Sequence, residues 1–106
     1  MQGIGQALWE NMIYAPDTAQ LLAGSFLDYA MPRAFRLPTF KTALSEVPSP
    51  RNKLGVRGGG EGGTTPALAV VINAVVDALA PLGIRHVEMP ATSQSIWRAI
   101  RAAKRG

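Results

Sequence analysis

The longest apolar stretch of the chain lies between residues 67 and 79. Only Asn73 and Asp77 form a polar stripe within it, so the pattern predicts a helix that is buried on almost every side. Thr65 is a good N-cap residue and Pro66 suits the first helical position, which predicts the start of the helix at this point. We expect this helix to be the element around which the rest of the chain packs.

Helical spacing of apolar residues also appears at both ends of the chain. Residues 2–12 show it in spite of two glycines, and nothing caps the start of that segment. At the other end, Thr92 or Ser93 can cap a terminal helix. The apolar face of that terminal helix is expected to contain Ile96, Trp97 and Ile100.

Three further segments have strand-like patterns. Residues 13–26 contain a Pro-Asp turn between two short apolar runs and predict a hairpin. Residues 39–47 alternate apolar and polar positions, which is typical of a strand. Residues 84–89 predict a short strand or an extended segment. The fold class expected for residues 1–106 is therefore α+β: a single small mixed domain with a short antiparallel sheet and about three helices, one of them buried.

A glycine-rich loop precedes the apolar helix. Glycine stands at positions 55, 58, 59, 60, 62 and 63, and Glu61 is the only side chain in the centre of this run. The first turn of the following helix offers free backbone amides, which commonly hold phosphates and other anions. The spacing fits neither the P-loop nor the dinucleotide fingerprint. Composition alone is equally typical of a flexible linker.

Composition limits the classes of function that remain. The chain has no cysteine, which excludes disulfides, thiolate metal sites and iron–sulfur clusters held by this chain alone. No apolar run approaches the roughly 20 residues of a membrane span and no leader is visible, so we expect a cytoplasmic protein without membrane contact. The net charge of +4 includes a basic tail, which fits a solvated helix end better than a nucleic-acid site. His86, the one histidine, is assigned no function.

Three runs resemble a known family. GVRGGGEGGT at 55–64, followed by NAVVDAL at 73–79, is similar to the C-terminal portion of the large, molybdenum-binding subunit of the xanthine dehydrogenase and aldehyde oxidase family, which includes carbon monoxide dehydrogenase. GSFLDYAMP at 24–32 also matches that family, and we expect Asp28 and Tyr29 within it to pack and make hydrogen bonds. The resemblance is most specific at Gly55, Val56, Gly58, Gly60 and Glu61.

The resemblance implies a catalytic site. Glu61 occupies the position of the general base in a hydroxylation that uses water. Arg57, Gly58, Gly59 and Gly60 would face a molybdopterin cofactor, expected in a dinucleotide form, and no side chain of this chain would bind the metal. Arg57 stands where the family commonly has Lys, and Gly59 where a larger apolar residue is common.

The resemblance also implies a larger assembly. The chain corresponds to a small C-terminal part of the family's large subunit, so it would work with the remaining large-subunit domains and be inactive alone. FAD and 2Fe-2S clusters would lie on partner subunits, and the substrate would be a small aldehyde or N-heterocycle. One alternative is a truncated, non-catalytic remnant of that subunit. A third hypothesis is a basic module that binds phosphate or nucleic acid.

Overall fold

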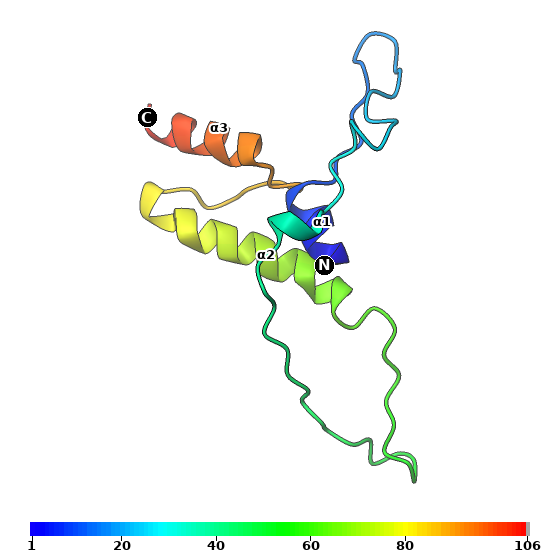
Figure 1. Ribbon diagram of the computed structural model, residues 1–106. Coiled ribbons are helices and arrows are strands. Elements are labelled where there is room, and N and C mark those ends of the chain that lie inside the picture. The colour runs from blue at the N-terminus through cyan, green and yellow to red at the C-terminus, as the bar shows by residue number, and fades with distance from the viewer. Residues whose placement is uncertain (106) are drawn as a thin grey trace.

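The computed structural model describes residues 1–105, which form three α-helices and two short 3-10 turns. Figure 1 shows the helices gathered in the middle of the molecule, with two long irregular segments projecting from them. The first segment connects α1 to η1, and the second connects η1 to α2. The elements are α1 (Gln2–Leu8), η1 (Ala34–Arg36), α2 (Thr64–Leu79), η2 (Ala80–Leu82) and α3 (Ser93–Ala103).

Helix α1 packs against the first turns of α2 through its small residues. A Cβ atom added at Gly3 would lie 2.6 Å from the Cβ of Ala67 and 2.7 Å from the backbone oxygen of Thr64. The two helices therefore approach so closely that only glycine fits at this position. Ala7, one turn further along α1, is buried and accepts a hydrogen bond of 2.7 Å from the amide of Ala91. Gly3, which appeared unfavourable for a helix, is thus a point of contact between α1 and α2, whereas Gly5 lies against Glu10 and Pro32.

The hydrophobic core lies where α2, the segment after it and α3 meet. Its buried residues are Leu79, Ile84, Val87 and Ala91. Partly buried residues of α1, α2 and α3 surround them: Leu8, Ile72, Val75, Val76, Ile96, Ala99 and Ile100. Figure 1 shows residues 84–91 running between α2 and α3, with no strand partner on either side. Residues 84–89 are thus the extended segment that the sequence predicts, and they contribute Ile84 and Val87 to the core.

The start of α3 agrees with its predicted cap. The Oγ1 atom of Thr92 accepts a hydrogen bond of 3.1 Å from the amide of Ser95, so Thr92 is the N-cap. Trp97 is 59% exposed, and the guanidinium carbon of Arg101 lies 5.6 Å from the centroid of the indole ring system. The expectation that Trp97 joins the packed face was wrong, because this residue lies on the side of α3 turned away from the core.

The predicted antiparallel sheet is wrong. Between residues 13 and 26 the chain does reverse, but the only pairing there is an isolated antiparallel bridge between Tyr14 and Leu21. Residues 39–47 are exposed and form no strand. An alternating pattern needs a neighbouring strand to pair with, and none of residues 1–105 supplies one. The fold is therefore helical and irregular over the described residues, rather than α+β.

Helix α2 is also less buried than its sequence pattern predicts. It begins at Thr64 with Gly63 as the N-cap, instead of with Thr65 as the cap, and Leu79 is its one buried residue. Together with η2 it forms a 19-residue apolar helix with a mean hydropathy of 1.7, long and apolar enough to cross a membrane by length and composition. This corrects the expectation that no run approaches that length, although core helices of water-soluble proteins have the same properties.

The chain is much more open than a compact domain of its length. Its radius of gyration is 18.3 Å, whereas about 13 Å is typical for a globular chain of this size. Its accessible surface is 8723 Å², whereas a folded monomer of this mass typically exposes about 5,700 Å². Part of the excess is apolar, since Phe26, Leu27, Leu44 and Val70 are all more than 60% exposed.

Candidate functional site

The glycine loop, residues 55–63, starts at a tight turn. Gly55 has φ +67°, in the left-handed region that favours glycine. Its amide donates a hydrogen bond of 3.1 Å to the backbone oxygen of Asn52, and its own oxygen accepts one of 2.9 Å from the amide of Ser49. The sequence Pro48-Ser49-Pro50 thus reverses the chain and returns it towards α2.

Two side chains hold this turn closed, and we call them the loop clamp: Asn52 and Arg57. The amide group of Asn52 donates from Nδ2 to the backbone oxygen of Val56 at 2.8 Å and accepts from the Val56 amide at 3.1 Å. Arg57 donates from Nε to the oxygen of Val47 at 2.6 Å and from Nη2 to the oxygen of Pro48 at 3.3 Å. Arg57, predicted to contact a cofactor, therefore has partners within its own chain; the cofactor contact stays a prediction.

The three glycines after the clamp are open on every side. A Cβ atom added at Gly58, Gly59 or Gly60 would meet nothing within 4 Å, and all three residues are exposed. None of their amides donates a hydrogen bond to another group of residues 1–105. Such a stretch can bring backbone amides within contact distance of a bound molecule without steric interference.

Glu61 lies at the entrance of α2. Its backbone oxygen accepts hydrogen bonds of 3.1 Å from the amides of both Thr64 and Thr65, which joins the loop to the first turn of the helix. Its side chain is exposed and makes no hydrogen bond to the part of the chain that the structure describes. The carboxylate is therefore next to a helix N-terminus, where negative charge is stabilised. The start of α2 does not cover this side chain, since Leu79 is the one buried residue of the helix.

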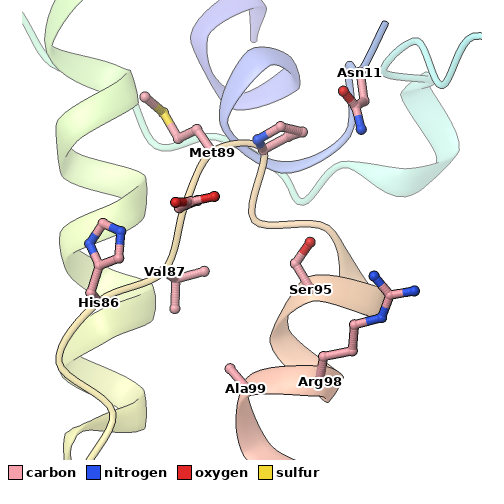
Figure 2. A pocket seen from close by; sticks show the side chains of 9 residues that line it. Asn11, His86, Val87, Met89, Ser95, Arg98 and Ala99 are labelled. Atoms are coloured by element: carbon pink, nitrogen blue, oxygen red, sulfur yellow. The ribbon is translucent and has the colours of Figure 1, made fainter. Parts of the chain in front are cut away.

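A separate groove of about 530 Å³ lies between residues 86–90 and the first half of α3, with Asn11 at its edge. Figure 2 shows Ser95 and Arg98 on α3, with residues 86–89 opposite them. His86, the residue to which the sequence assigned no function, is exposed and lines this groove. Among residues 1–105, no three His, Cys, Asp or Glu side chains gather in a way that could hold a metal ion.

The pair Glu10 and Tyr29 ties the first projecting segment to the end of α1. The Tyr29 hydroxyl donates a hydrogen bond of 2.8 Å to Oε2 of Glu10. This hydrogen bond, together with partial burial and the negative charge of Glu10, raises the pKa of Tyr29. Asp28 accepts a hydrogen bond of 2.6 Å from the hydroxyl of Ser25. Both residues thus make the hydrogen bonds expected of them.

Sequence reasoning missed the loop clamp and the groove. The clamp had a usable signal, since an Asn three residues before a glycine in a proline-rich turn often bonds to its own backbone. The groove had none, because residues far apart in the sequence line it.

No protein-family model matches the chain. Among curated proteins, it is 42% identical over 101 residues to the nicotine 6-hydroxylase large subunit of Paenarthrobacter nicotinovorans, which covers 95% of this chain. It is 32% identical over 102 residues to the carbon monoxide dehydrogenase large chain of Hydrogenophaga pseudoflava, which covers 94% of it. The chain spans 12% of the length of each of these relatives.

Two crystal structures contain a segment with the same shape. Quinoline 2-oxidoreductase from Pseudomonas putida 86 matches with a TM-score of 0.82 and 38% identity, over 94% of this chain and 13% of that one. The Cu,Mo-dependent carbon monoxide dehydrogenase matches with a TM-score of 0.85 and 27% identity, over 96% of this chain and 13% of that one. The open arrangement of helices and projecting segments is thus found inside much larger chains.

Proposed function

Because this chain is related over nearly its whole length to the large subunits of the xanthine dehydrogenase and carbon monoxide dehydrogenase family, we propose that it forms part of a molybdenum hydroxylase and supplies its general base. The substrate class that fits this reaction is a small aldehyde or N-heterocycle. The observation that carries the proposal is Glu61, exposed on an open glycine loop at the N-terminus of α2.

The open shape supports an assembly with further polypeptide. The chain exposes roughly 3,000 Å² more surface than a compact monomer of its mass. Covering that area on one chain would bury roughly 6,000 Å² summed over both partners, at the upper end of large permanent interfaces, which bury about 2,000–5,000 Å² or more. The exposed apolar side chains of α2 and of both projecting segments would be covered by the remaining large-subunit domains. Subunits that carry FAD and 2Fe-2S clusters would accept the electrons released by the reaction. A cytoplasmic location of the assembly stays a prediction.

The glycine loop is suited to a molybdopterin dinucleotide. Gly58, Gly59 and Gly60 leave their amides free and the space beside them empty, so a large anionic group can approach the backbone. The N-terminus of α2 adds favourable electrostatics for phosphate. Bound there, the cofactor would supply the two-electron chemistry of hydroxylation. The residues of this chain contribute contact, orientation and proton transfer.

Glu61 is the group that moves the proton. A carboxylate flanked by glycines can come close to a bound group without a steric barrier, and covering the site with other domains would remove water from it. A carboxylate placed in this way beside a bound group can accept a proton as a general base.

Replacement of Glu61 by Gln in the assembled enzyme tests this function. The amide keeps the size of the side chain and removes its basicity, so turnover should fall while molybdenum stays bound. Glu88→Gln is the matched control, since Glu88 is also exposed but lies on the segment after α2, outside the glycine loop. Equal activity of the two variants would contradict the proposal.

A further inference from the structure

We propose that Asn52 and Arg57, the loop clamp, are positioning residues that set the place of Glu61. This inference rests on the proposed function, because it concerns how the same carboxylate is presented. It assigns Arg57 a task different from the cofactor contact that the sequence predicts.

The glycines between the clamp and Glu61 cannot hold their own conformation. Gly58, Gly59 and Gly60 have no side chains, and nothing lies within 4 Å of their Cβ positions. Glycine also has the largest range of backbone conformations to lose when it is fixed. The location of the carboxylate therefore depends on what holds the two ends of this run.

Both ends of the run are held by hydrogen bonds. On the far side, the backbone oxygen of Glu61 accepts from the amides of Thr64 and Thr65, which fixes it to α2. On the near side, the clamp closes residues 47–57 into a compact turn by four side-chain hydrogen bonds. Three residues then bridge two fixed points, which restricts the directions in which Glu61 can face.

The chemistry of the Arg57 side chain suits a role in holding the turn closed. Its Nε and Nη2 atoms donate to two successive backbone oxygens, those of Val47 and Pro48, neither of which carries a charge. The planar guanidinium group presents donors in fixed directions, whereas the lysine ammonium is a single point on a flexible stem. Lysine at this position keeps the positive charge and loses the paired contact. Charge and geometry can therefore be separated experimentally.

The first test uses the full chain and does not depend on the proposed function. In Asn52→Ala, amide hydrogen exchange of Val56 should become at least tenfold faster than in the unchanged chain, because its acceptor is lost. Arg51→Gln is the matched control, since Arg51 is exposed and its side chain makes no hydrogen bond within residues 1–105. Equal Val56 exchange in Asn52→Ala and Arg51→Gln would overturn the clamp.

The second test uses the holoenzyme. A misplacement of about 1 Å can cost roughly a hundredfold in rate, so Arg57→Gln should lower kcat by about tenfold to a hundredfold. Arg57→Lys, which introduces the residue common in the resembling family, should lower kcat by less, because its ammonium group can still donate one of the two hydrogen bonds. KM and bound molybdenum should stay unchanged. A loss of molybdenum in Arg57→Gln with normal content in Arg57→Lys would instead show a charge contact with the cofactor and overturn the inference.

The two ideas fail in different ways. If Glu61→Gln abolishes turnover while Arg57→Gln and Asn52→Ala keep full kcat, the clamp has no positioning role and the proposed function stands. If Glu61→Gln keeps full turnover, the proposed function fails, and the positioning role fails with it even where Val56 exchange confirms the clamp.

Discussion

Replacement of Gly3 by Ala tests the contact that places the start of α2. The added methyl carbon would lie 2.6 Å from the Cβ of Ala67 and 2.7 Å from the backbone oxygen of Thr64, so one helix must move. Overpacking of this kind typically costs 1–3 kcal/mol, and the better helix propensity of Ala returns about 1 kcal/mol. Because one obstructing atom is backbone, we expect a net cost of about 1–2 kcal/mol.

Hydrogen exchange at the Ala91 amide measures this cost directly. That amide donates to the backbone oxygen of Ala7 on α1, so it exchanges when α1 separates from the core. A cost of about 1–2 kcal/mol corresponds to exchange that is roughly 5- to 30-fold faster. Gly24→Ala is the control, because its nearest obstruction is a side-chain carbon of Leu21 at an ordinary 3.5 Å. Unchanged Ala91 exchange in Gly3→Ala would refute the packing of α1 on α2.

Two further predictions concern the cap of α3 and the tyrosine of the first projecting segment. Thr92→Ala should cost about 1 kcal/mol of local stability and speed hydrogen exchange of the Ser95 amide. Thr92→Ser keeps the hydroxyl oxygen, so exchange of this amide should stay unchanged. Equal exchange of the Ser95 amide in the two variants would exclude the cap. In a Tyr14→Phe background, absorbance titration should place the pKa of Tyr29 above 10.0, and Glu10→Ala should lower that pKa. The stability that this pair contributes is present below about pH 10 and is lost as the pH rises through the pKa of the folded state. A Tyr29 titration without a shift would exclude the hydrogen bond.

The helices could be predicted from the sequence because their signals are local. Thr92 supplies an oxygen to an amide three residues away, and the apolar run of α2 has no helix breaker, so neither depends on distant parts of the chain. The contact of α1 with α2 through Gly3 could not be predicted in the same way. It depends on which residue of α2 stands opposite, and a glycine in an isolated helix indicates only a weaker helix.

The sheet and the buried helix were predicted wrongly for one shared reason. Alternation in residues 39–47 and the apolar surface of α2 both indicate that a segment will be covered, but not that this chain supplies the cover. Val70 is 63% exposed in a helix whose sequence is typical of a core. Such a pattern fits a segment of the larger relatives, of which this chain spans 12–13%.

For the glycine loop too, the features that depend on neighbouring residues could be predicted from the sequence, and those that depend on distant residues could not. Its position before a helix was predictable, and so was the isolation of Glu61 among glycines. The clamp depends on the side chain of Arg57 reaching back ten residues to Val47, which spacing alone does not reveal. The structure gives Arg57 partners in the turn before the loop, and the cofactor contact that the resemblance implies for it stays a prediction.

The most direct test of the account is turnover per bound molybdenum atom in the holoenzyme that contains this chain, compared between the unchanged protein and Glu61→Gln. Removal of a positioned general base typically lowers the rate by about two to four orders of magnitude. We predict a loss of that size at equal molybdenum content, with Glu88→Gln unaffected. Turnover in Glu61→Gln that stays within a few-fold of the unchanged enzyme would contradict the central claim.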